Sequence, residues 1–190
     1  SFRNVNNPIG IFPSSKKEQA AEKLDKIGFP FSYISSVAEA GLHNPNLIVH
    51  TVGAIMSIPR IEKTHGDYVM YHEVFTPSVW NILEKLDGEK MDVLEKMGFE
   101  RLPYAEACKI RNSPNDRRSA KEVFMWYAAM PSAVAGPTVV DSRYITEDVP
   151  QGLVMLESLG KHLGVKTPMT TSLIEIASAA LRRDLREKGR

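Results

Sequence analysis

Several features that would mark a metal site, a disulfide, a membrane span or a nucleic-acid site are missing from this 190-residue sequence. The single cysteine, Cys108, has no partner for an internal disulfide, which is typical of a reducing compartment. The histidines show none of the close His and Cys spacings of structural metal sites. Apolar stretches such as LIVHTVGAIM fall short of the ~18 residues of a membrane-spanning helix. With a net charge of +1 and no long basic run, the sequence predicts a soluble, cytoplasmic protein without metal, membrane or nucleic-acid partners.

Nucleotide-binding motifs are missing as well. The sequence contains neither the Gly-x-Gly-x-x-Gly turn of a dinucleotide-binding domain nor a P-loop. Its first residue is Ser1, where a natural chain would begin with methionine. With 43% hydrophobic and 25% charged residues, the sequence can still bury a sizeable core. We therefore expect one folded domain and a fragment of a second.

The fragment is expected at the N-terminus. PIGIFPSS has the pattern of a short buried strand leading into a turn, and Ser15 precedes Glu18 by the three residues of a capping box. The segment KKEQAAEKLDKIG is an amphipathic pattern that ends at Gly28, a residue suited to follow a helix. One strand and one helix predict that residues 1–40 are the remnant of the end of a nucleotide-binding domain.

From residue 41 to residue 190 the pattern is helical. About five substantial helices are expected. Each begins at a Ser, Thr, Asn or Asp, which is followed either by proline or, three residues later, by Glu or Gln. These starts are Asn44–Pro45, Thr76–Pro77, Ser119 with Glu122, Asp148 with Gln151, and Thr167–Pro168. No second strand is convincing. The fold class is therefore mainly α, with Met125, Trp126 and Tyr127 expected in the core and the final RRDLREKGR on a solvated helical face.

Two places in this helical region carry polar residues that suggest chemistry. Asn46 and His50 are four residues apart on an otherwise apolar helix and share one face. Arg143 and Asp148 bracket the start of a later helix. Each also has a simple structural interpretation. His50 could be a hydrogen-bonded core histidine, Asp148 a helix N-cap, and Arg143 a surface ion-pair partner of little energetic weight.

Three segments together resemble, in order and spacing, the C-terminal domain of the octopine/nopaline (opine) dehydrogenase family. They are HNPNLIVH, YHEVFTPSVWNILEKLDGEKMDVLEKMG and GPTVVDSRYITEDVPQGLVMLESLGKHLGVKTP. The resemblance covers roughly residues 8–190, and RYITEDVPQGL followed by a helix and VKTP is its most specific element. It implies the helical dehydrogenase domain of 6-phosphogluconate-dehydrogenase type, preceded by the end of a Rossmann domain, which GIFPS resembles.

The resemblance implies a two-domain enzyme that condenses an amino acid with a 2-oxo acid and reduces the product with NADH or NADPH. The cofactor would be bound mainly by an upstream domain absent from this chain, so the isolated chain is expected to be inactive. His50 falls on the family's catalytic histidine and Asp148 on the acidic residue that pairs with it. Arg143 falls on an arginine placed for a substrate carboxylate, and Asn46 on a polar, substrate-binding position. The helical surface could also support a homodimer.

These residue types suit the implied reaction. Histidine gives and takes protons near neutral pH, and a neighbouring carboxylate orients the ring. Arginine binds carboxylates through a planar pair of N–H donors. Two alternatives remain: a hydroxy-acid dehydrogenase, which a central catalytic lysine would favour, and a non-catalytic helical dimerisation module. The second predicts that His50 and Asp148 lie far apart or are packed away from any cleft.

Overall fold

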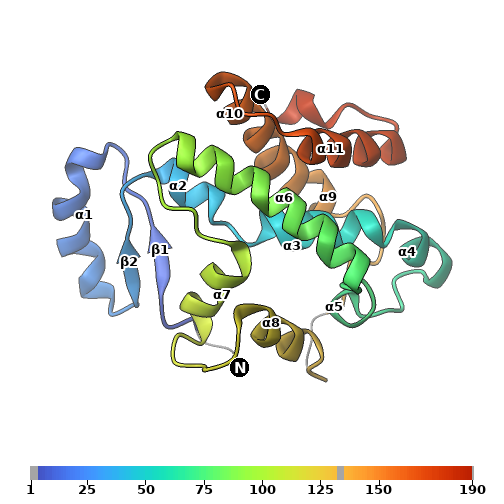
Figure 1. The fold of residues 1–190 in the computed structure, drawn as a ribbon, viewed down its shortest axis with the longest axis horizontal. Helices are drawn as coiled ribbons and strands as arrows, with labels where there is room; N and C mark the ends of the chain where they lie inside the picture. The colour runs from blue at the N-terminus through green and yellow to red at the C-terminus, as the bar shows by residue number, and fades with distance from the viewer. Residues whose placement is uncertain (1–3, 132–134, 190) are drawn as a thin grey trace.

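The computed structural model describes residues 4–131 and 135–189 and is mainly helical, as the sequence predicts (Figure 1). In chain order its elements are β1 (Asn7–Ile9), a 3₁₀ turn (Ser14–Lys16), α1 (Lys17–Leu24), a 3₁₀ turn (Asp25–Ile27), β2 (Phe31–Tyr33), α2 (Val37–Leu42), α3 (Asn46–Met56), α4 (Ile58–Thr64), α5 (Met70–Glu73), α6 (Pro77–Lys96), α7 (Tyr104–Asn112), α8 (Ala120–Ala128), α9 (Arg143–Thr146), the π-helix η3 (Val149–Val154), α10 (Met155–Leu163), α11 (Pro168–Leu181) and the 3₁₀ helix η4 (Leu185–Lys188). None of the helices in these ranges combines the length and apolar character needed to cross a membrane.

The N-terminal unit is a strand–helix–strand unit, so the expectation of a single strand was wrong. β1 and β2 are parallel, with Pro8 opposite Ser32, and α1 makes the crossover between them. Both strands are only half-buried, which also corrects the expectation of a buried strand. The second strand was missed because its three residues, Phe31–Tyr33, are too short to show an alternating pattern.

The start of α1 also differs from the expectation. The helix begins at Lys17, after a 3₁₀ turn at Ser14–Lys16, and no side chain of the described residues caps it. The predicted capping box between Ser15 and Glu18 was therefore wrong, because the tight turn occupies the position of the cap. The end was predicted correctly: Gly28 takes a left-handed φ of 70° and stops the helical segment.

Helix α3 runs through the centre of the helical region. Eight of its residues are buried, which explains why the segment is apolar on nearly every side. The N-cap of α3 is Pro45, one residue later than predicted, but the side-chain oxygen of Asn44 still accepts a hydrogen bond from the first helical N–H, that of Asn46, at 3.1 Å. The helix ends at Met56, and α4 begins at Ile58 with Pro59 in its first turn, where a missing N–H costs nothing.

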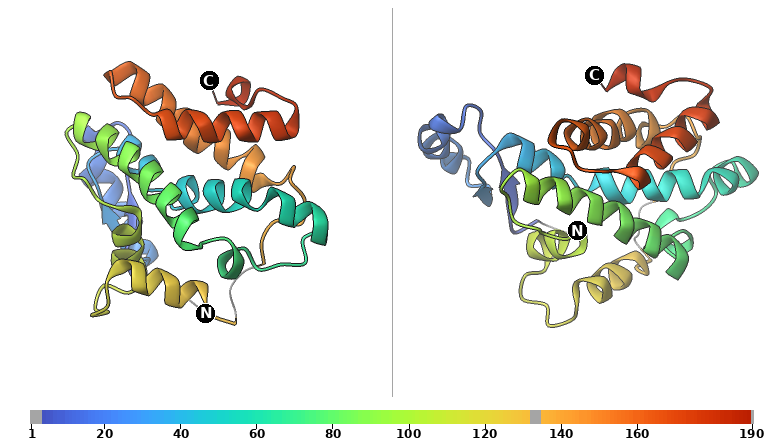
Figure 2. Two further views of the ribbon diagram at one scale, coloured as in Figure 1. Left: turned by 45° about the vertical axis from the view of Figure 1, so that its right-hand side comes forward. Right: turned by 45° about the horizontal axis from the view of Figure 1, so that its top comes forward.

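Helix α6 crosses α3 and lies between α10 and α11 on one side and α7 and α8 on the other (Figures 1 and 2). Two buried carboxylates on α6 cap other helices. Asp87 accepts a hydrogen bond from the Tyr104 N–H at the start of α7. Glu89 accepts from the N–H groups of Met169 and Thr170 at the start of α11. The cap of α11 thus comes from Glu89, which lies 80 residues away, and not from Thr167 as the sequence suggested.

The C-terminal residues fold back onto the domain. After α11 the chain turns at Arg182, with a φ of 51°, and η4 packs against η3. Leu185 is buried, and the Arg186 guanidinium donates two hydrogen bonds to the buried carboxylate of Glu157. The prediction of a solvated helical face for RRDLREKGR was therefore wrong.

Candidate active site

The two acid–base candidates from the sequence meet in the structure. Nδ1 of His50, on α3, lies 2.8 Å from Oδ2 of Asp148, which directly precedes η3. The side chains are 19% and 8% exposed, so both are largely withdrawn from water. A carboxylate buried to this degree requires a hydrogen-bonding partner, and here His50 is that partner.

The hydrogen bond to His50 replaces the helix-capping role considered for Asp148. The backbone of Asp148 is already helical, with φ −71° and ψ −29°, and its side chain makes no capping bond to the first turn of the described helix. The N-cap interpretation of Asp148 was therefore wrong. Its carboxylate points across to α3 instead of along its own helix.

The chain after Asp148 adopts an uncommon conformation. Residues Val149–Val154 form a π-helix, which occurs mostly as a short insert near functional sites. Gly152 in this insert packs against α3, since a Cβ at this position would lie 3.2–3.3 Å from atoms of Leu47. The close approach of η3 to α3 brings Asp148 within reach of His50, one turn beyond Leu47.

Tyr144 on α9 completes the immediate surroundings of the imidazole. Its ring lies over His50 with a centroid separation of 4.1 Å and an interplanar angle of 38°. Burial, and to a smaller extent the nearby charge of Asp148, raise the pKa of the Tyr144 phenol, which stays protonated at neutral pH. Tyr144 was not among the predicted site residues, although its place four residues before Asp148 could have suggested a shared helical face.

Neither Arg143 nor Asn46 forms a hydrogen bond with this pair in the part of the chain that the structure describes. The Arg143 side chain is 68% exposed, and its Nη2 lies 3.4 Å from a carboxylate oxygen of Glu147. An exposed pair of this kind contributes little to stability, so the guanidinium can exchange Glu147 for another carboxylate. Asn46 is half-buried and stands one helical turn before His50.

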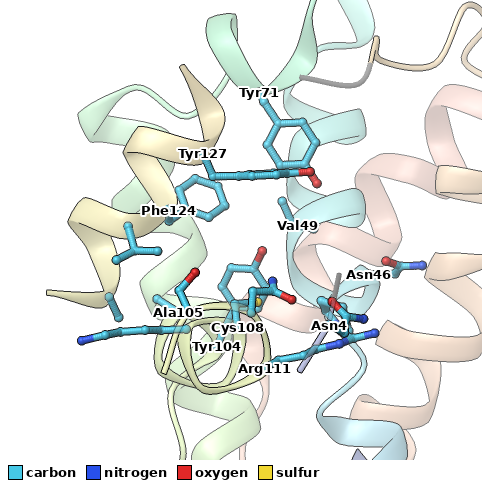
Figure 3. Close-up of a pocket in the computed structure, with 16 residues that line it drawn as sticks. Asn4, Asn46, Val49, Tyr71, Tyr104, Ala105, Cys108, Arg111, Phe124 and Tyr127 are labelled. Atoms are coloured by element: carbon cyan, nitrogen blue, oxygen red, sulfur yellow. The ribbon is translucent and has the colours of Figure 1, made fainter. Parts of the chain in front are cut away.

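Asn46 also lines a cavity of about 220 Å³ that sequence reasoning did not anticipate. The cavity lies between α3 and the pair α7 and α8, and Figure 3 shows Tyr71, Tyr127 and Phe124 grouped along one part of its wall. Tyr127 was expected in the core but lies half-buried at this wall, and its neighbour Trp126 is 45% exposed, which corrects that expectation too. Met125 packs against the core as predicted.

The geometry supports proton transfer at one defined atom. With Nδ1 bound to Asp148, a neutral imidazole donates its Nδ1 hydrogen to the carboxylate and keeps Nε2 as a proton acceptor. After taking up a proton at Nε2, the ring is a cation beside a carboxylate, which stabilises it. His50 can therefore act as a base and then as an acid, while Asp148 fixes the ring orientation.

The turn after β1 contains Gly10, where an added Cβ would meet the main-chain oxygen of Ser36, so protein backbone occupies that space. No group of three or more His, Cys, Asp or Glu side chains placed for a metal occurs in residues 4–131 and 135–189.

Comparison with known proteins identifies the same family that the sequence resembles. Residues 33–181, which contain all four site residues predicted from the sequence, match the family model described as NAD/NADP octopine/nopaline dehydrogenase, alpha-helical domain. The chain is 26% identical to an opine dehydrogenase of Arthrobacter sp. (strain 1C) over 184 residues, covering 96% of this chain and 50% of the relative. It is 27% identical to a vitopine synthase of Allorhizobium ampelinum over 147 residues, covering 77% of this chain and 40% of the relative. The chain thus spans half the length of these curated relatives or less.

Proposed function

This chain belongs to the NAD/NADP octopine/nopaline dehydrogenase family as an alpha-helical domain, and from that premise we propose that it supplies the acid–base and substrate-binding groups of an opine-forming enzyme. The proposed reaction condenses an amino acid with a 2-oxo acid and reduces the condensation product with NADH or NADPH. The observation that carries the proposal is the 2.8 Å contact between His50 and Asp148, because it places a carboxylate-oriented imidazole in a domain of this family.

The proton transfers of the condensation can be assigned to His50. The amine must lose a proton before its nitrogen attacks the oxo-acid carbonyl, and Nε2 of His50 accepts that proton. The attack gives an adduct in which a proton moves from the nitrogen to the alkoxide oxygen, forming the carbinolamine. Nε2 of His50 then returns its proton to the hydroxyl oxygen, which departs as water and leaves an iminium ion for reduction. The imidazole takes up one proton and releases one, so it ends in its starting state. Hydride transfer is the chemistry of the cofactor, and no step of it is assigned to residues of this chain.

Arg143 and Asn46 are proposed to bind substrate. Both substrates carry a carboxylate, and the exposed guanidinium of Arg143 offers the planar pair of donors that binds one. It stands on α9 next to Tyr144, whose ring covers His50, so a carboxylate held there would lie close to the proton-transfer site. Asn46 presents its amide one turn before His50, on a nearby part of the same helix.

The cofactor is proposed to be NAD or NADP, bound mainly by a nucleotide-binding domain upstream of the helical residues. Residues 1–40 would be the end of that domain and residues 41–190 the catalytic domain. The family description supports this division, since it names the matched region as one domain of an NAD/NADP enzyme. The strand–helix–strand unit at Asn7–Tyr33 also supports it, because parallel strands joined by a crossover helix are the building unit of such domains.

Product analysis tests the proposed function. The complete natural protein is incubated with NADH or NADPH, an amino acid and a 2-oxo acid, and products are identified by mass spectrometry. We expect coenzyme oxidation only when both substrates are present, together with a secondary amine that carries two carboxylates. Oxidation with the oxo acid alone, giving a hydroxy acid, would contradict the proposal.

A further inference from the structure

The charged residues that line the cavity between α3 and the pair α7 and α8 are all cationic. In the described structure, Lys109 and Arg111 are the cations among its lining residues, and no Asp or Glu lines it. Its phenols and its thiol do not compensate. Burial raises the pKa values of Tyr71, Tyr104 and Cys108, so these groups stay neutral at physiological pH. The cavity wall is therefore neutral or positive throughout.

Arg111 is the cation best placed to bind a ligand. Lys109 already donates to the main-chain oxygen of Arg118 at 2.7 Å. The Arg111 guanidinium faces the side-chain amide of Asn4, whose oxygen, in the amide orientation that satisfies both groups, accepts from Nε and Nη2 at 3.0 and 3.1 Å. Within the described ranges Arg111 forms no ion pair with a carboxylate. A half-buried guanidinium with neutral partners is ready to receive a carboxylate.

The backbone of Arg111 is fixed in place. Its carbonyl oxygen accepts hydrogen bonds from the N–H groups of Val5 and Asn6 at 2.9 and 3.2 Å. The last turn of α7 is thereby tied to the chain just before β1. The guanidinium itself is held by its hydrogen bonds to the side chain of Asn4.

The rest of the cavity suits a short carbon chain. Tyr71 and Tyr127 meet edge to face with centroids 5.6 Å apart, and Tyr71 also contacts Phe124 with centroids 6.2 Å apart. Figure 3 shows these rings on one side of the cavity, with Arg111 and Asn4 toward the other end in that view. An aromatic wall with an arginine at the far end fits a ligand that has an apolar stem and a terminal carboxylate.

The cavity adjoins helix α3, which carries His50. Asn46 and Val49 line it, and Asn46 lies one helical turn before His50 on the same helix. A turn of helix rises about 5.4 Å, a distance that an amino-acid side chain can span. On the basis of the proposed function, we propose that the cavity receives the side chain of the amino-acid substrate, and that Arg111 selects side chains ending in a carboxylate over neutral and basic ones.

The wild-type protein gives the first test. The complete natural protein is assayed with NADH or NADPH, one 2-oxo acid, and glutamate, glutamine or lysine as the amine. We expect kcat/KM to be about 10- to 100-fold higher for glutamate than for glutamine, the range for losing a hydrogen bond to a charged group. Lysine should be the poorest of the three. Equal values for glutamate and glutamine, or a preference for lysine, would overturn the inference without the use of any variant.

Variants assign the selectivity to one residue. Arg111→Gln should lower kcat/KM for glutamate to near the value for glutamine, mainly through KM, so that the 10- to 100-fold preference for glutamate over glutamine is lost. Arg117→Gln is the matched control, because Arg117 is an exposed cation in the adjacent loop and does not line the cavity. If Arg111→Gln lowered kcat/KM for all three amino acids by the same factor, Arg111 would not determine selectivity. If no amino acid gave a secondary amine, the proposed function itself would fail.

Discussion

His50 and Asp148 are 98 positions apart in the chain, and their side chains form one hydrogen-bonded pair, Nδ1 to Oδ2, of 2.8 Å. The pair exists because two helical segments pack closely: Gly152 in η3 lies against Leu47 in α3. The carboxylate engages Nδ1 of the ring, and a neutral imidazole with its hydrogen on Nδ1 carries its acceptor lone pair on Nε2. The contact excludes one of the two arrangements expected of a dimerisation module, in which the two side chains lie far apart.

Glu89 is predicted to be a major contributor to stability. Its buried carboxylate accepts three hydrogen bonds, from the Met169 N–H and from the N–H and hydroxyl of Thr170. Glu89→Gln places an NH₂ group against these donors and removes the charge at a helix N-terminus. We expect a loss of about 1–3 kcal/mol in unfolding free energy, or roughly 2–4 °C in Tm per kcal/mol, in thermal or urea unfolding. Glu62→Gln, on an exposed helical surface, should change Tm little; a Glu89→Gln protein as stable as this control would refute the capping role.

The ion pair between Glu157 and Arg186 is expected to make the stability of the fold sensitive to acid. Chiefly through hydrogen bonds from the Arg186 guanidinium, the pKa of Glu157 falls from 4.5 to about 2. A lowered pKa in the folded state means that the ionised carboxyl stabilises the fold. That stability is complete above pH 4.5 and is lost as the pH falls toward about 2. Tm should therefore drop through this window in the wild type, and Arg186→Met should lower Tm at neutral pH and flatten the drop. Parallel Tm curves for the two proteins would contradict this assignment.

Arg143 is predicted to act on substrate binding and not on stability. Because its side chain is exposed and weakly paired, Arg143→Lys should leave Tm unchanged. In the complete protein the change should raise the apparent KM of at least one substrate, because an ammonium does not reproduce the paired donors of a guanidinium. Steady-state kinetics with each substrate varied in turn measure this effect. Unchanged KM values for both substrates would leave Arg143 as a surface ion-pair residue; Arg117→Lys is the control for general charge effects.

Much of the fold could be predicted from local sequence patterns. The capping box of Ser119 with Glu122 is present, and Gly98 and Gly164 end their helices with left-handed φ angles of 84° and 71°. The patterns failed where a distant residue replaces a local one. Thr167 was expected to cap α11, but the hydrogen bonds come from Glu89, and no local pattern reveals a partner on another helix.

The candidate site also combines features that the sequence reveals with features that depend on contacts between distant residues. The contact between His50 and Asp148 was anticipated only through the resemblance to a family, because neither periodicity nor spacing relates residues 98 positions apart. Tyr144 and the cavity lined by Tyr71 and Arg111 were missed, since they arise from the packing of α9, α7 and α8 against α3. From the sequence alone, aromatic residues in a helical pattern that line a cavity cannot be distinguished from those that lie in the core.

The role of the His50–Asp148 pair makes a prediction about rates. His50→Ala should reduce kcat by about 10²–10⁴, the usual effect of losing a positioned acid–base group. Asp148→Asn keeps the shape of the side chain and removes its charge, so it should also cause a large rate loss, with little change in Tm. Tyr144→Phe is a useful comparison, because it keeps the ring over His50 and removes only the hydroxyl group.

The double-mutant cycle of His50→Ala and Asp148→Asn, measured as kcat in the complete protein, tests the central claim most directly. If the two residues act as one acid–base unit, their effects are strongly non-additive, and the double mutant is little slower than His50→Ala alone. If the losses multiply, or if Asp148→Asn retains the wild-type rate, the pair is a structural contact and the proposed mechanism is wrong.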